Sequence, residues 1–384
     1  MTPPGPAVPP AGAAGAAGTA GAQPVLHLTG PVLTGPDTEV AQAWVVGGRV
    51  TFEPPTAPGT DVVRVAGWVL PGLVDAHSHV GLDAHGAVDE PTQVAQAVAD
   101  RDAGALLLRD AGSPVDTHWI DDREDLPKII RAGRHIARTG RYLRGFGEEI
   151  EPAELPDTVR RQAARGDGWV KLVGDWIDRA TGDLAPCWPA DALKAAIDAA
   201  HEAGARVTAH CFGEDCLPDL LAAGIDGIEH ATGLRDDAVV AAAAAGDVAV
   251  VPTLVNIATF PGIADRGEAK FPLYAAHMRD LHAHRYETVR TLWEAGVPVR
   301  CGTDAGGSLR HGLVAGEVAE LVTAGLPVTA ALDAATWAAR RWLGRPGIEE
   351  GAPADLVVYA ADPRRDVGVL RHPSAIVLRG HRVR

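Results

Sequence analysis

The strongest constraint on the fold is an alternation between short apolar runs and longer alanine-rich stretches, which extends from Leu70 to about Gly344. Each run has the length of a buried strand, whereas stretches such as 190–203 and 272–295 have the length of helices. Such an alternation predicts an α/β fold, a parallel (β/α)8 TIM barrel whose functional residues lie at the carboxyl ends of the strands. The eight runs are 72–80, 105–110, 129–137, 169–174, 206–212, 227–232, 249–255 and 298–304.

The segments on either side of the barrel have β character. Short apolar stretches within residues 25–69 are separated by Gly, Pro and Asp, which favour turns, and the same pattern returns within residues 345–384. We expect the two segments to form one composite β-sandwich domain, with residues 70–344 inserted as the barrel domain. The expected strands are 25–28, 43–52, 62–65, 354–359, 375–378 and 381–384.

Residues 1–24 consist almost entirely of Ala, Gly, Pro and Thr. They contain no Lys or Arg before an apolar run, so a signal peptide is not expected. They also lack the large apolar side chains whose burial could offset the entropy lost on ordering. The sequence therefore predicts a disordered tail.

The charge and cysteine content exclude several classes of protein. The formal net charge is −15 and no basic block is present, which argues against nucleic acid or an anionic membrane as the main partner. The sequence contains no run of 18 or more apolar residues, which is the length that a membrane-spanning helix needs. The four cysteines form no C-x-x-C pair and no disulfide framework, so we expect a reducing compartment and a cytoplasmic protein. A small-molecule substrate is the partner that we expect. The sequence leaves homo-oligomerisation open.

Histidines and an aspartate gather at the predicted carboxyl ends of strands. His77 and His79 are two positions apart at the end of the first run, so both side chains point to the same side of the strand and can bind one metal ion. A single pair of this kind also occurs on ordinary surfaces. The fifth, sixth and eighth runs, however, bring His210, His230 and Asp304 to the same rim, which favours a metal site.

Lys171 lies inside the apolar fourth run, in a chain where only four of the 35 basic residues are lysines. Arginine stays protonated, whereas a buried lysine with a lowered pKa can expose a neutral amine that reacts with CO₂. The resulting carbamate has two oxygens and could bridge two metal ions. The alternative is a lysine whose stem packs at the strand end while its amine reaches water.

These motifs together resemble those of the amidohydrolase superfamily, over nearly the whole chain after residue 24. The resemblance rests on the sequence PGLVDAH ending at His77, the strand-four lysine, the later histidines, GTD at 302–304 and the closing segment GIEEGAPADLVV at 347–358. Within the superfamily the chain is most similar to the imidazolonepropionase-like and prolidase-like branch. The features shared with that branch are LRDAG at 108–112, IEH at 228–230 and TL at 253–254.

The resemblance implies a binuclear metal centre with carboxylated Lys171 as the bridge. His77, His79 and Asp304 would bind the more buried ion, and His210 and His230 the other. Zn²⁺ suits these ligands best, although Mn²⁺, Fe²⁺ and Co²⁺ remain open. The metals would supply hydroxide near neutral pH, and Asp304 would pass its proton to the leaving amine. The catalytic residues are then Asp304, Lys171 and His230.

One segment departs from the pattern. Relatives often carry T-G-G-H after the third strand, where this chain has TGRY at 139–142, so Tyr142 stands where a histidine would contact substrate. This difference places a dipeptidase activity in doubt. Four further residues in the loops after the third, fourth and eighth strands are candidates for substrate contact: Arg144, Arg179, Arg310 and His311.

Two enzymatic hypotheses follow. The first is two-metal hydrolysis of a linear or cyclic amide bond, as in a dipeptidase or an N-acyl amino acid hydrolase. The second is a mononuclear deaminase or lactam/lactone hydrolase, in which Lys171 is unmodified and His230 orients the substrate. Mononuclear deaminases usually carry a glutamate near the fifth strand, and Glu214 is poorly placed for that task. In a non-enzymatic binding or scaffold protein on the same barrel, we would expect some of the metal-ligating residues to have been replaced, whereas all six are present.

Overall fold

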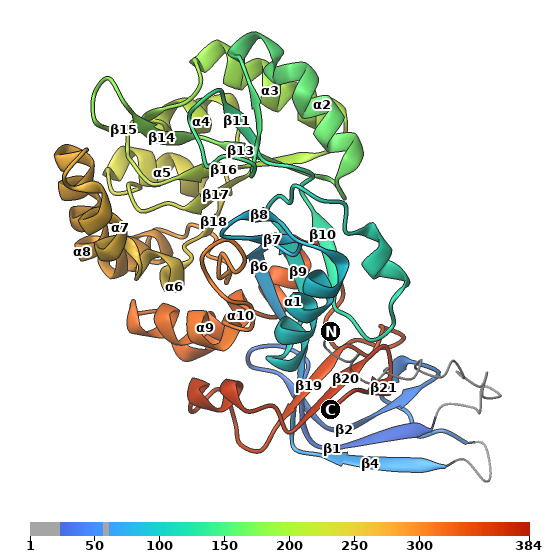
Figure 1. The fold of residues 1–384 in the computed structure, drawn as a ribbon. Coiled ribbons are helices and arrows are strands. Elements are labelled where there is room, and N and C mark those ends of the chain that lie inside the picture. The colour runs from blue at the N-terminus through green and yellow to red at the C-terminus, as the bar shows by residue number, and fades with distance from the viewer. Residues whose placement is uncertain (1–23, 57–60) are drawn as a thin grey trace, which may run out of the picture.

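A computed structural model describes residues 24–56 and 61–384, so all but the last residue of the predicted tail lies outside the described part. Parallel strands surrounded by helices occupy the middle of the chain, and a mixed sheet lies at one end of the molecule (Figure 1). The predicted α/β class is confirmed. None of the helices in the described part of the chain is both long enough and apolar enough to cross a bilayer.

The parallel strands form two sheets. The first has the order β10-β9-β6 and the second the order β12-β11-β13-β16-β17-β18. Six of the predicted runs each contain one of these strands, because their apolar residues are buried on both faces, as in other parallel sheets. The bounds are β6 (Leu73–Ser78), β9 (Ala105–Asp110), β10 (Lys128–Arg131), β11 (Ile136–Arg138), β12 (Glu148–Ile150), β13 (Trp169–Val173), β16 (Arg206–Cys211), β17 (Gly227–His230) and β18 (Ala249–Val251).

Two of the predicted strands differ from the structure. The third run is divided between β10 and β11, because Gly133 takes a left-handed φ of 69° between them. The eighth run is not a strand. Isolated parallel bridges from Val250 to Val299 and from Ser78 to Ala305, just past its end, join it to its neighbours, and its last residue, Asp304, has a left-handed φ of 59°. Within the described residues no ladder joins β10 to β11, so the strands do not close into one continuous hydrogen-bonded ring.

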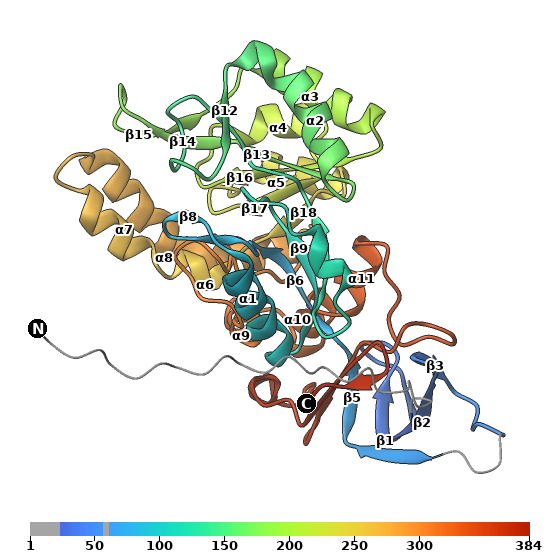
Figure 2. The same ribbon diagram turned by 45° about the vertical axis from the view of Figure 1, so that its right-hand side comes forward.

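The helices follow the strands as the alternation predicts. The two predicted helices at 190–203 and 272–295 are formed within one residue of those limits. A pair of additional short helices, α6 and α7, separates β18 from α8, and α7 packs against α8 (Figure 2). The bounds are α1 (Glu90–Asp102), α2 (Leu155–Arg165), α3 (Ala190–Glu202), α4 (Leu217–Ala223), α5 (Asp237–Ala245), α6 (Leu254–Ile257), α7 (Phe260–Gly267), α8 (Pro272–Glu294), α9 (Val314–Thr323), α10 (Val328–Ala334) and α11 (Trp337–Trp342).

Strands from both ends of the chain share one eight-stranded sheet, in the order β21-β20-β19-β5-β1-β2-β3 with β4 also paired to β1. Gly67 separates β4 from β5 and lies against Gly30, where only glycine fits, because a Cβ on Gly30 would lie 2.4 Å from the Gly67 oxygen. Buried residues from both ends form one apolar cluster. The assignment of residues 25–69 and 345–384 to one composite domain, and the β-sandwich form of that domain, remain predictions. The bounds are β1 (Val25–Leu33), β2 (Glu39–Val46), β3 (Arg49–Thr51), β4 (Val62–Ala66), β5 (Trp68–Pro71), β19 (Leu356–Tyr359), β20 (Ala375–Leu378) and β21 (His381–Arg382).

Candidate metal centre

Three of the predicted ligands converge at the end of β6. The Nε2 atoms of His77 and His79 are 3.1 Å apart. Asp304 Oδ1 lies 3.1 Å from the first of these nitrogens and 3.0 Å from the second. The three side chains therefore offer one ligand atom each to a common point, which is the geometry of a metal-binding group.

The contacts of the other ring nitrogens show which atoms are free to bind a cation. His79 Nδ1 lies 2.7 Å from the carbonyl oxygen of Gly112, and His77 Nδ1 lies 2.7 Å from Glu229 Oε2. Both oxygens can only accept, so each Nδ1 carries the proton and each Nε2 presents a lone pair toward Asp304. Two lone pairs and a carboxylate facing one another repel unless a cation lies between them. The donor set thus fits a divalent metal such as Zn²⁺.

Glu229 is a fully buried carboxylate on β17 that supports His77. It accepts hydrogen bonds from the guanidinium of Arg109 and the hydroxyl of Thr208. Burial acts to raise the pKa of Glu229, but the charges of Arg109, His77 and Lys171 outweigh it and hold that pKa well below the usual range. An anionic Glu229 keeps the Nδ1 proton of His77 in place.

His210, His230 and Lys171 lie beside this group. The ring centres of His210 and His230 are 4.7 Å apart, and those of His77 and His230 are 5.1 Å apart. Burial holds the pKa of both His210 and His230 well below the usual range, so both imidazoles are neutral. His230 Nδ1 contacts the hydroxyl of Thr253 at 2.7 Å, while the buried Nε2 of His210 has no hydrogen-bond partner in the described residues. Lys171 is 1% exposed, and burial lowers the pKa of its amine.

The backbone is strained at three positions of the site. His230, Thr253 and Asp304 have φ values of 66°, 48° and 59°, in the left-handed region that non-glycine residues rarely adopt. Each such conformation costs on the order of 1–3 kcal/mol and persists only where the surrounding structure enforces it. Two of the three are candidate ligands and Thr253 contacts one of them, His230, so the strain supports a functional role for this group.

A cavity of about 510 Å³ opens over the six predicted ligands, a size typical of small-molecule sites. Tyr142 and Arg144 line it, as the loop position predicts. Arg179 and Arg310 are exposed and are not among the residues that line it. His311 is not among them either, because it is buried against Asp100, whose Oδ2 lies 2.7 Å from its Nδ1.

The Tyr142 ring is held between aromatic neighbours. Its centre lies 4.8 Å from that of Trp176, 5.5 Å from that of His135 and 5.9 Å from that of His210. The adjacent Arg141 fastens the loop to the hairpin of β14 (Asp175–Asp178) and β15 (Asp183–Pro186), because it donates to Asp178 at 2.9 Å. Burial raises the pKa of Tyr142, so its phenol is neutral and can donate a hydrogen bond.

Sequence reasoning missed several residues of the site. Asn256 on α6 donates to Asp304 Oδ2 at 2.7 Å, and Arg266 and Tyr274 bring helices α7 and α8 to the cavity. Arg109 and Glu229 had been noted only as parts of motifs. A charged residue inside a fully buried strand needs a partner, and that rule could have singled out Glu229.

The chain matches the model of the amidohydrolase family over residues 68–380, and it belongs to this family. It is accordingly a hydrolase that acts on carbon–nitrogen bonds, as the motifs predicted. It is 58% identical over 356 residues to an uncharacterized protein of Mycobacterium tuberculosis, a match that covers 92% of this chain and 95% of that one. An uncharacterized protein of Mycobacterium bovis matches with the same identity and coverage.

Solved structures with similar folds agree with the family. A Xaa-Pro dipeptidase with bound methionine has a TM-score of 0.79 at 21% identity, covering 93% of this chain and 99% of its own. The ochratoxinase of A. niger has a TM-score of 0.77 at 19% identity, covering 94% of this chain and 96% of its own. At these sequence identities, the similarity to the two solved structures shows a shared fold alone.

Proposed function

We propose that the protein is a metal-dependent amidohydrolase that hydrolyses an amide bond, linear or cyclic, in a small-molecule substrate. The observation that carries this proposal is the convergence of two histidine Nε2 atoms and the Asp304 carboxylate at the floor of the 510 Å³ cavity. The remaining candidate ligands, His210, His230 and Lys171, line the same cavity. The closed (β/α)8 barrel belongs to the same proposal and is supported by the bridges at Val299 and Ala305.

The residues present fit two metal ions. His77, His79 and Asp304 would hold one, His210 and His230 the other, and a carbamate on Lys171 would bridge them. When bound, the metals would supply Lewis acidity, which lowers the pKa of a water and polarises the scissile carbonyl. Zn²⁺ suits this donor set, and Mn²⁺, Fe²⁺ or Co²⁺ would also be accepted.

The protein's own side chains complete the chemistry. Asp304 accepts the proton of the attacking water and delivers it to the leaving amine, and Asn256 orients the carboxylate by its bond to Oδ2. The phenol of Tyr142 donates to the substrate carbonyl oxygen. Arg144 at the rim pairs with a substrate carboxylate, which favours dipeptides or N-acyl amino acids.

Metal analysis tests this proposal. We expect purified protein to hold close to two divalent metals per chain and to turn over at least one member of a panel of dipeptides, N-acyl amino acids, lactams and lactones. His77→Ala should lose metal and Asp304→Asn nearly all turnover, whereas His201→Ala, at an exposed histidine paired with Asp226, should change neither. Protein that binds no divalent metal would contradict the proposal.

A mononuclear deaminase or lactam/lactone hydrolase is the second candidate. It is favoured by one observation, that only the group of His77, His79 and Asp304 brings its ligand atoms together within the described residues. In that case a single metal would give full activity, and substitution of His230 would leave the metal content unchanged.

A further inference from the structure

A second cavity, of about 440 Å³, lies where the parallel strands meet the terminal sheet. Leu106 and Leu107 at the start of β9, and Lys128 and Ile129 at the start of β10, form part of its wall. The metal ligands His77 and His79 are at the opposite, carboxyl end of the neighbouring parallel strand β6. This junction cavity is therefore separate from the candidate metal centre, and it is large enough for a small molecule.

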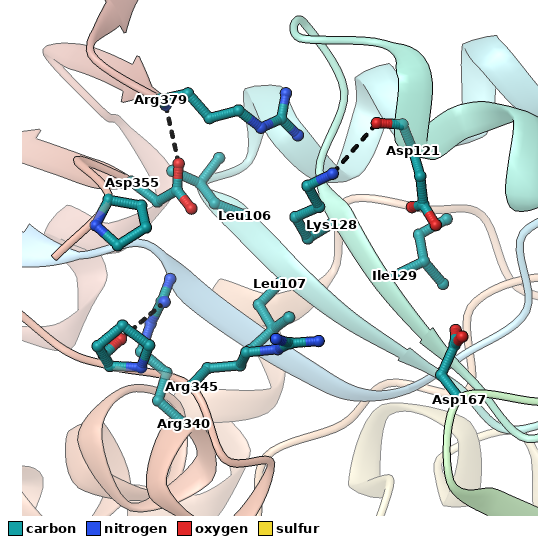
Figure 3. Close-up of a pocket in the computed structure, with 12 residues that line it drawn as sticks. Leu106, Leu107, Asp121, Lys128, Ile129, Asp167, Arg340, Arg345, Asp355 and Arg379 are labelled. Atoms are coloured by element: carbon teal, nitrogen blue, oxygen red, sulfur yellow. Dashed lines mark hydrogen bonds between the residues drawn. The ribbon is translucent and has the colours of Figure 1, made fainter. Parts of the chain in front are cut away.

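Cationic side chains surround the junction cavity. Figure 3 shows Lys128, Arg340, Arg345 and Arg379 arranged around the leucines of β9. Within the described residues none of these four side chains makes an ion pair with a carboxylate. Three of them donate to backbone carbonyls instead: Lys128 to Asp121 O at 3.1 Å, Arg340 to Gly72 O at 2.8 Å, and Arg379 to Leu126 O at 2.8 Å.

The acidic residues of the cavity are engaged elsewhere. Arg131 lies 3.0 Å from a carboxylate oxygen of Asp121 and 3.0 Å from one of Asp167. Asp355 Oδ1 accepts from the backbone amide of Arg379 at 2.8 Å, so it binds the main chain of that residue and not its guanidinium. The wall of the junction cavity thus keeps positive charge that no protein carboxylate contacts directly.

Burial makes this charge costly to leave unpaired. Arg340 is 5% exposed, and burial lowers its pKa to about 10 although the charge of Asp355, which makes no direct ion pair with it, acts in the other direction. A buried cation without a counter-ion is unfavourable, even when backbone carbonyls satisfy part of its hydrogen bonding. An anion in the cavity would offset the cost.

We propose that the junction cavity binds a small organic anion, whose carboxylate or phosphate group is held by Lys128 and Arg345. Arg345 is exposed at the rim and can make a bidentate pair, while the ammonium of Lys128 supplies a compact charge. The apolar wall of Leu106, Leu107 and Ile129 suits a ligand with a short apolar body. The site is independent of the proposed hydrolysis.

Binding would be measured on the full chain with two probes, inorganic phosphate and succinate, against chloride at equal ionic strength. Each probe that binds the native state raises the melting temperature with its concentration. We expect at least one probe to bind in the millimolar range, and Arg345→Gln and Lys128→Gln each to weaken that binding about tenfold or more. Preference between the two probes distinguishes a phosphate ligand from a carboxylate ligand.

Two control variants locate the effect. Arg341→Gln removes an exposed arginine of α11 that lies outside the cavity and contacts Asp333, so it should leave binding unchanged. Arg266→Gln removes a cation of the candidate metal cavity and should likewise leave binding unchanged. Failure of both probes to bind, or binding that neither Arg345→Gln nor Lys128→Gln weakens, would overturn the proposal.

Discussion

At the scale of single residues, the amine of Lys171 is subject to opposing effects. Burial lowers its pKa, while the carboxylates of Glu229 and Asp304 act in the other direction. A lowered pKa increases the share of neutral amine, which is the form that reacts with CO₂. The lowered pKa of Lys171 therefore supports the proposed carbamate.

We expect Lys171→Arg to abolish activity as fully as Lys171→Ala, because arginine keeps the charge but cannot form a carbamate. Short carboxylic acids should partly restore the alanine variant by standing in for the bridge. Turnover and metal content of both variants would be measured with and without acetate. Normal activity of Lys171→Arg would exclude the bridging role.

Tyr142→Phe keeps the ring packing against Trp176 and removes only the hydroxyl. We expect kcat/KM to fall about tenfold, or roughly 1.4 kcal/mol of transition-state stabilisation, with unchanged metal content. The measurement is steady-state kinetics on the best substrate found. An unchanged kcat/KM would assign Tyr142 to loop packing alone.

Glu229→Gln replaces the anion that receives the Nδ1 proton of His77. We expect metal affinity to fall about 10–100-fold, because the amide lacks the negative charge that orients the His77 ring and pairs with Arg109. Metal affinity would be titrated by competition with a chelator. Asp226→Asn, at a carboxylate bound to the exposed His201, serves as a control and should retain full affinity.

The six candidate ligands could be selected from the sequence because each is a chemically distinctive residue in or at the end of an apolar run, and the structure places all six around one cavity. The role of Glu229 could not be predicted, because its partner Arg109 is 120 positions away in the chain and only the fold brings them together. For the same reason His311 was assigned to substrate from its place after the eighth run, whereas its actual neighbour is Asp100.

At the scale of elements, His277 of α8 joins three segments beside the cavity. Its Nδ1 lies 3.0 Å from Asp183 Oδ1 on β15, and its Nε2 lies 3.0 Å from Glu214 Oε2 after β16. The hydrogen bond to Glu214 is the largest cause that raises the pKa of His277, to about 9. The imidazolium thus fastens α8 to the β14–β15 hairpin.

The folded-state pKa of His277 exceeds the unfolded value of about 6.5, so its stabilisation is complete below that pH and is lost as the pH rises through about 9. We expect His277→Gln to destabilise the protein by on the order of 1 kcal/mol near pH 6, allowing for its partial exposure, and by much less near pH 10. Denaturant unfolding at several pH values would measure the difference. His284→Gln, at a partly exposed position of the same helix, should have a smaller effect near pH 6.

Element boundaries were predictable where apolar periodicity alone decides them, as in α3 and α8. They were not predictable where a backbone conformation interrupts an apolar run. Gly133 divides the third run, and the eighth forms only isolated bridges and ends at Asp304 in a left-handed conformation. That conformation also places the Asp304 carboxylate beside the two histidines, so the departure from regular structure belongs to the site.

At the scale of the whole molecule, Arg340 connects α11 to the chain between the terminal sheet and the parallel strands. Its Nε and Nη2 both donate to Gly72 O, at 3.0 and 2.8 Å. We expect Arg340→Met to lower stability by about 1–3 kcal/mol, because a buried carbonyl loses its partners. Thermal unfolding would show this change, while Arg341→Met on the exposed side of α11 should be near neutral.

The pairing of β19 with β5 has a consequence for synthesis on the ribosome. Residues 68–71 are made early, but their partner at 356–359 is among the last parts of the chain to emerge. Until then β5 has an open edge able to pair with another nascent chain. Translation that stops before residue 356 would yield a polypeptide that carries all six candidate ligands, Asp304 included, together with a permanently unpaired edge of this kind.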